Sequence, residues 1–120
     1  MSGTRDNKIP PEIVTQEATE TASYSDTEIE LGDFISGDTF TEFEIKVNTI
    51  FNGGVPAASI GIDSDHEKYL TEAQCDLTQT GTYIIEDTIP LASDETIKAY
   101  VDGDGATEGS LTATVRFLDT

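Results

Sequence analysis

Short runs in which apolar and polar residues alternate recur along the chain, and turn residues separate them. The clearest run, "TFTEFEIKVNTIF" (39–51), places Phe43, Ile45, Val47 and Phe51 on one side. A period of two is that of a half-buried β-strand. We count about seven or eight such runs, and a helical turn around "EKYLTEA" (67–73) is the only exception. The pattern predicts an all-β, two-sheet antiparallel β-sandwich that is jelly-roll-like, with an immunoglobulin-like sandwich as the second choice.

The first 26 residues differ from the rest in composition. They are polar and contain two consecutive prolines, so we expect residues 1–26 to form an extended N-terminal arm and residues 27–120 to form the sandwich domain. The arm is either a disordered leader or a segment that becomes ordered by adding to a neighbouring sheet. Ile13 and Val14 in "EIVTQ" are the candidate partner-binding residues for the second alternative.

Further strands are expected at 29–31, 58–63, 73–77 and 82–87. The acidic segment "DSDHEKY" (63–69) reads as a loop. Two alternating runs, 96–101 and 111–117, flank the stretch "YVDGDGATEGS" (100–110), and we expect them to form a terminal hairpin with a solvated acidic tip.

The glycine-rich and acidic stretch at 100–110 invites comparison with a calcium loop. An EF-hand loop needs a glycine at its sixth position and a glutamate at its twelfth. Counting from Asp102, those positions hold Thr107 and Ala113, so a turn explains the stretch better. Calcium requires only convergent oxygens, and two acidic groups therefore stay open as weak candidates: Asp63, Asp65 and Glu67, and Asp102, Asp104 and Glu108.

Charge excludes several classes of partner. The chain has 24 Asp and Glu against 6 Lys and Arg, a formal net charge of -18. Such a chain repels nucleic acid and anionic membrane surfaces, so we expect neither as a partner. The sequence shows no apolar run long enough to span a bilayer and no signal-peptide core, which predicts synthesis in a cytoplasm.

The sequence offers no convincing catalytic group. His66 is the only histidine and Cys75 the only cysteine, so neither a disulfide within the chain nor a zinc site of the usual ligands can form. A reactive Cys75–His66 pair would need electropositive surroundings, whereas His66 stands among carboxylates. Paired carboxylates for glycoside hydrolysis would lack a tryptophan platform. We therefore expect no enzyme activity, no catalytic residues and no cofactor.

The order of the strands resembles that of a known group. "IELGDFISGDTFTEFEIKVNTIFNGG", "SIGID", "DLTQTGTYI" and the closing "GSLTATVRF" look like small β-sandwich proteins of tailed-phage virions, in particular capsid decoration or cement proteins. The resemblance covers about residues 29–117. It implies a non-enzymatic homotrimer that binds the major capsid protein on the outer surface of an icosahedral head and braces neighbouring subunits. The protein would be made in the host cytoplasm and end in the virion.

An alternative from another class is a receptor- or glycan-binding module of a tail fibre or other surface adhesin. Its acidic loops would hold calcium that bridges sugar hydroxyls. The chain has no tryptophan for such a surface, although four tyrosines supply flat rings: Tyr24, Tyr69, Tyr83 and Tyr100.

Overall fold

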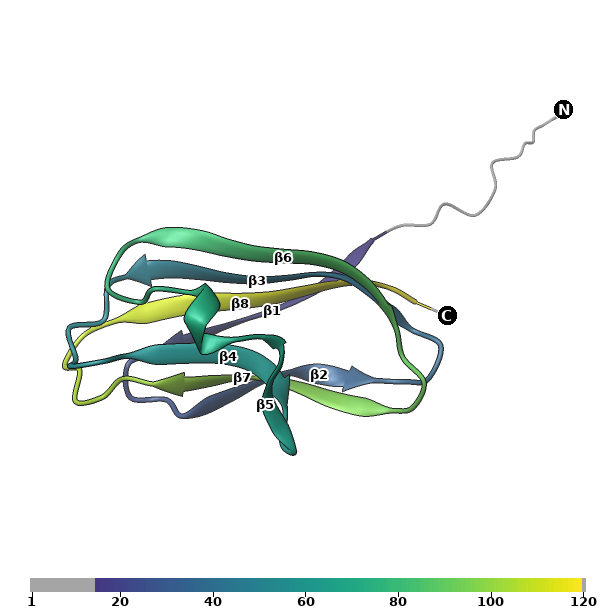
Figure 1. Cartoon of the computed structure of the whole chain (residues 1–120), viewed down its shortest axis with the longest axis horizontal. Helices are drawn as coiled ribbons and strands as arrows, with labels where there is room; N and C mark the ends of the chain where they lie inside the picture. The colour runs from purple at the N-terminus through teal and green to yellow at the C-terminus, as the bar shows by residue number, and fades with distance from the viewer. Residues whose placement is uncertain (1–14, 120) are drawn as a thin grey trace, which may run out of the picture.

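The computed structural model describes residues 15–119, which form two four-stranded antiparallel sheets packed face to face (Figure 1). This architecture confirms the predicted β-sandwich. Helix in the described residues amounts to one 3-10 turn, η1 (Glu72–Gln74). Within these residues, no helix is long and apolar enough to cross a membrane.

The eight strands divide equally between the sheets. The first sheet has the order β1-β8-β3-β6 and the second the order β2-β7-β4-β5. Their bounds are β1 Gln16–Ser23, β2 Glu28–Phe34, β3 Thr39–Thr49, β4 Ala57–Ile62, β5 Asp65–Leu70, β6 Gly81–Pro90, β7 Glu95–Asp102 and β8 Ser110–Leu118.

The pairing of the strands is that of a jelly roll. β1 pairs with β8, β2 with β7, β3 with β6 and β4 with β5, so the chain is one long hairpin folded over itself. The β3–β8 and β4–β7 pairs then join the strand pairs into two sheets. The predicted jelly-roll character is therefore confirmed.

An aromatic cluster joins the two sheets inside the sandwich. Phe40 of β3 is fully buried, with its ring centroid 5.1 Å from that of Phe34 in β2 and 5.3 Å from that of Tyr69 in β5. Phe43 of β3 stacks on Tyr69 at 4.6 Å. These edge and stacked contacts add to the burial of apolar area that holds the sheets together.

The sandwich begins earlier than the boundary expected at residue 27. β1 pairs along its whole length with β8, from Gln16 opposite Phe117 to Ser23 opposite Ser110. The side chains of β1 that pack against the core are the small ones of Ala18 and Ala22. The sequence of the segment therefore looks like that of a polar arm. Ile13 and Val14 lie outside the described residues.

Two segments around residue 70 differ from expectation. The acidic segment is not a loop, because residues 65–70 form edge strand β5, of which only Tyr69 and Leu70 are buried. The expected strand at 73–77 is instead η1 followed by an irregular stretch. Its alternation arises because Cys75 and Leu77 are buried while their neighbours are exposed.

The expected terminal hairpin is also wrong. β7 belongs to one sheet and β8 to the other, so residues 103–109 cross between the sheets instead of closing a hairpin. Alternation reveals which side of a strand is buried, but it does not reveal which strand lies beside it.

Candidate functional site

Cys75 and His66, the candidate nucleophile and base, contact different parts of the protein. The Cys75 thiol is buried and donates a hydrogen bond to the carbonyl oxygen of Ala58 at 3.1 Å. Burial raises the pKa of this thiol to about 11. His66 lies on the exposed side of β5, where its ring stacks on Tyr100 at a centroid distance of 3.7 Å. A buried, protonated thiol is not an activated nucleophile.

The environment of Cys75 predicts low reactivity in the folded protein. At about pH 8, we expect a thiol reagent to modify folded protein far more slowly than protein unfolded in guanidinium, because the folded thiol is both buried and protonated. Absorbance of the released thiol chromophore measures both rates. Equal rates in the folded and unfolded states would contradict the buried position of Cys75.

The raised pKa of Cys75 also makes the stability of the fold depend on pH in the alkaline range. The pKa of Cys75 is about 11 in the folded state against an ordinary value of 9.0, so the folded state binds more protons between these values. The free energy of unfolding should therefore fall as the pH rises through that window. Urea unfolding at about pH 7 and pH 10 measures the fall, and the Cys75→Ala variant should show a smaller one.

The first acidic candidate group is committed to protein contacts. The Asp63 carboxylate accepts a hydrogen bond from the Tyr100 hydroxyl at 2.8 Å and lies 3.1 Å from the Lys98 ammonium. These partners, the Tyr100 hydroxyl first, lower the pKa of Asp63. Asp65 accepts from the backbone amide of Glu67 at 3.2 Å, and the Glu67 carboxylate accepts from the amide of Glu72 at 2.8 Å.

The second acidic candidate group holds loops together. Asp102 Oδ1 accepts from the amide of Asp104 at 2.9 Å, and Asp104 Oδ2 accepts from the amide of Val55 at 2.6 Å. Glu108 is held through its backbone, which hydrogen bonds with Asn52. Among residues 15–119, no group of three or more His, Cys, Asp and Glu side chains is arranged to hold a metal ion.

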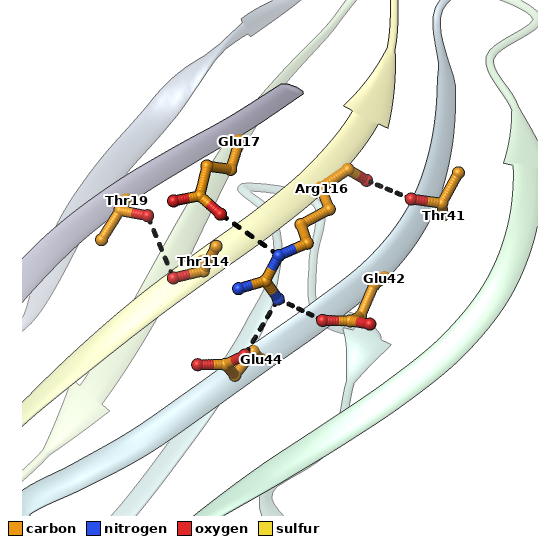
Figure 2. A network of polar contacts seen from close by, with 7 residues as sticks. All are labelled: Glu17, Thr19, Thr41, Glu42, Glu44, Thr114 and Arg116. Atoms are coloured by element: carbon orange, nitrogen blue, oxygen red, sulfur yellow. Dashed lines mark hydrogen bonds and ion pairs between the residues drawn. The ribbon is translucent and has the colours of Figure 1, made fainter. Parts of the chain in front are cut away.

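An arginine organises the outer face of the first sheet (Figure 2). Arg116 of β8 donates from Nε to Glu17 of β1 at 3.2 Å and from a terminal nitrogen to Glu44 of β3 at 2.9 Å. The same nitrogen also pairs with Glu42 of β3. The Glu44 hydrogen bond is the largest cause of a raised pKa for Arg116. One cation thus ties three strands together and leaves the face with excess negative charge.

Threonine pairs continue this face beside Arg116. The hydroxyls of Thr19 and Thr114 are 3.1 Å apart, as are those of Thr21 and Thr112. Each pair joins directly opposite residues of β1 and β8. Cross-strand hydroxyl pairs of this kind stabilise the register without burying apolar surface. The part of this face formed by β1, β8 and β3 is therefore lined by hydroxyl and charged side chains that contact one another.

The outer face of the second sheet carries a shallow hollow of about 240 Å³. The stacked Tyr100 and His66 rings line it together with Ser59, whose hydroxyl donates to the carbonyl of His66 at 2.6 Å. Burial and the Asp63 hydrogen bond raise the pKa of Tyr100. Glu28, Glu72 and Asp102 add carboxylates to the lining. The Ser59 hydroxyl in this hollow is engaged by the backbone carbonyl of His66 and not by its imidazole.

The loops at one end of the sandwich expose apolar side chains. Tyr24 lies in the loop after β1, and Ile50 and Val55 lie in the loop after β3. Both loops lie at the end of the sandwich away from the start of β1 and the end of β8 (Figure 1). Sequence reasoning missed this feature and the Arg116 cluster. The signal for the cluster was present, because Arg116 and Glu44 stand on the polar sides of their runs, but their adjacency depends on the β3–β8 pairing.

Comparison with solved structures finds the same fold in chains of three phage capsids. The sequence itself matches no family model and no curated protein sequence. The structure is similar to a chain in the acidic stable capsid of Helicobacter pylori bacteriophage KHP30, with a TM-score of 0.68 and 13% identity over 88% of this chain and 87% of that one.

Two further similarities extend over nearly the whole chain. A chain of the cyanophage Pam1 capsid asymmetric unit matches with a TM-score of 0.63 and 9% identity, covering 100% of this chain and 98% of that one. A chain of the Ralstonia phage GP4 capsid matches with a TM-score of 0.54 and 14% identity, covering 97% and 92%. At these identities the comparisons establish a shared fold.

Proposed function

We propose that this chain is a virion structural protein that binds the outer surface of an icosahedral phage head and braces neighbouring subunits of the major capsid protein. The observation that carries the proposal is the fold: three chains from phage capsids share it over at least 88% of this chain. Their own lengths are covered by 87% or more, so the likeness concerns whole chains of capsid assemblies.

Charge supports the outer surface over the inner one. The described residues hold only four Lys and Arg side chains, and ion pairs with carboxylates engage Lys68, Lys98 and Arg116. With a net charge of -18, the chain would be repelled by packaged DNA. The proposed role is structural and not enzymatic, in keeping with a Cys75 thiol whose pKa burial raises to about 11 and a His66 ring that stacks on Tyr100.

The rings that a glycan-binding alternative would use are largely covered. Tyr69 and Tyr100 are each only 8% exposed, and Tyr83 is half-buried and donates to the carbonyl of Asp76. Tyr24 alone among the four tyrosines is an exposed ring, at 40%. A sugar platform needs accessible ring faces. The structure therefore favours the capsid role.

The homotrimer belongs to the same proposal and has a testable dependence on salt. With -18 charges on each subunit, association at low salt works against repulsion. Because salt shortens the screening length from ~30 Å at ~0.01 M to ~3 Å at ~1 M, we expect the trimer to strengthen as salt increases. Sedimentation equilibrium across a salt series measures this, and a monomer at every salt concentration would remove the trimer from the account.

Co-sedimentation with empty shells tests the function itself. Shells of the major capsid protein that lack this chain are mixed with purified full-length protein and pelleted. We expect saturable binding at a fixed number of copies per shell, with nucleic acid absent. A protein that stays in the supernatant at all concentrations would contradict the proposed function.

Co-sedimentation with empty shells also tests whether the N-terminal residues contribute to binding. We propose that Ile13 and Val14 add to an edge strand of a neighbouring subunit, where backbone hydrogen bonds supply affinity. A deletion that ends at residue 14 leaves β1 complete, since β1 begins at Gln16. The truncated protein should keep the circular dichroism spectrum of the full chain and bind shells more weakly. Undiminished binding would remove this role.

A further inference from the structure

Three loops meet at one end of the sandwich and carry three of the five exposed large apolar side chains that the structure describes. The loops are residues 24–27, 50–56 and 103–109, at the end away from the start of β1 (Figure 1). Val55 is 77% exposed, which makes it the most exposed large apolar residue that the structure describes, and Tyr24 and Ile50 are 40% and 41% exposed. We call these three side chains the apolar tip.

Hydrogen bonds fix the loops that carry the apolar tip. The Asp104 carboxylate accepts from the amide of Val55 at 2.6 Å, and the Asp104 carbonyl accepts from the amide of Gly54 at 3.1 Å. Asn52 Oδ1 accepts from the amides of Thr107 at 2.7 Å and Glu108 at 3.2 Å. The side chain of Val55 is therefore exposed on a loop that hydrogen bonds already hold in place. A partner that binds it does not have to pay the entropy of ordering this loop.

The loops are also in close contact, with no room for additional side chains between them. A Cβ atom on Gly53 would lie 1.9 Å from the carbonyl oxygen of Gly103, and one on Gly103 would lie 2.7 Å from the carbonyl oxygen of Tyr24. The amide of Tyr24 donates to the carbonyl of Gly109 at 3.0 Å. The loop of residues 103–109 thus lies between those of Tyr24 and Val55 and connects them.

Charge around the apolar tip is entirely negative. The three loops contain Asp26, Asp104 and Glu108 but no lysine or arginine. The four cations of residues 15–119 lie instead within strands, as Lys46, Lys68, Lys98 and Arg116. A complementary partner must therefore combine an apolar surface with a basic rim.

We propose that the apolar tip inserts into an apolar depression rimmed by lysine or arginine side chains on the outer surface of the major capsid protein. The inference rests on the proposed function and adds which end of the sandwich faces the shell. Interface hot spots fill well-packed, fully desolvated pockets of the partner, and tyrosine, the residue type of Tyr24, is enriched among them. Ile50 and Val55 would add apolar area that the partner removes from water. Other exposed apolar residues stand elsewhere: Ile35 after β2 and Ile84 in edge strand β6.

Matched charge insertions test the orientation. The variants Val55→Asp and Ile84→Asp each place one carboxylate on an exposed apolar position, at the tip and on β6 respectively. We expect Val55→Asp to weaken co-sedimentation with empty shells by about tenfold or more and Ile84→Asp to change it by less than about twofold. Val55→Ser, which adds no charge beside Asp104, should show a smaller loss in the same direction.

The outcomes separate the inference from the function. Melting temperatures close to that of the unaltered chain show that all three variants are folded, as expected at exposed positions. Shell binding by the unaltered chain with equal binding by Val55→Asp would overturn the inference alone. A loss confined to Ile84→Asp would overturn it in favour of the sheet edge. Failure of the unaltered chain to bind would overturn the proposed function and this inference with it.

Discussion

Replacing Phe40 by alanine is expected to lower the free energy of unfolding by about 3–5 kcal/mol. Phe40 is fully buried and contacts Phe34 and Tyr69 of the opposite sheet as well as Phe43 of its own strand. Removing its ring leaves a cavity where the two sheets meet. Neighbouring strands can close only part of it, because their hydrogen-bonded register fixes their positions.

Urea unfolding followed by circular dichroism measures this loss. Phe40→Leu, which keeps most of the side-chain volume, should cost about 1–1.5 kcal/mol. Val55→Ala serves as the control, because its side chain is 77% exposed and the change should stay within about 0.5 kcal/mol. A cost below about 1 kcal/mol for Phe40→Ala would show that the aromatic cluster does not join the sheets as described.

The second large effect is expected at Gly109, at the end of the crossing loop. Its φ is +145°, which is unfavourable for residues with a Cβ, and a Cβ there would lie 2.6 Å from the buried ring of Phe51. Gly109→Ala should therefore combine backbone strain with overpacking, at a total of about 2–5 kcal/mol.

Gly105 offers a matched control within the same loop. Its φ is +83°, yet nothing lies within 4 Å of the position its Cβ would occupy. Gly105→Ala should cost only the backbone strain, about 1–2 kcal/mol. The difference between the two variants in urea unfolding contains the contact with Phe51 together with the greater backbone strain at a φ of +145°. Equal losses would contradict the close packing of residue 109 against that ring.

The faces of the strands could be predicted from the sequence because a period of two is a local property. Phe43, Ile45 and Val47 are buried as the alternation of their run indicates. β5 escaped detection because it is an edge strand that buries only Tyr69 and Leu70, so its charged residues read as a loop. β1 escaped because alanine is the residue it presents to the core.

Contacts between side chains of different strands could not be predicted from the sequence, because they depend on which strands are neighbours. Arg116 and Glu44 are 72 residues apart, and only the β3–β8 pairing brings them to 2.9 Å. The same holds for Tyr100 and His66, which stack across β7 and β5 although those strands are not neighbours in their sheet. Within the acidic stretch at 100–110, Asp104 holds the amide of Val55, and this contact joins residues 49 positions apart in the sequence.

Electron cryomicroscopy of particles that contain this chain would show where it binds. We expect density for the eight-stranded sandwich on the outside of the icosahedral shell, with the end that carries Tyr24 and Val55 toward the major capsid protein. Particles whose outer shell surface carries no such density, or in which the sandwich occurs only on the tail, would contradict the proposed function.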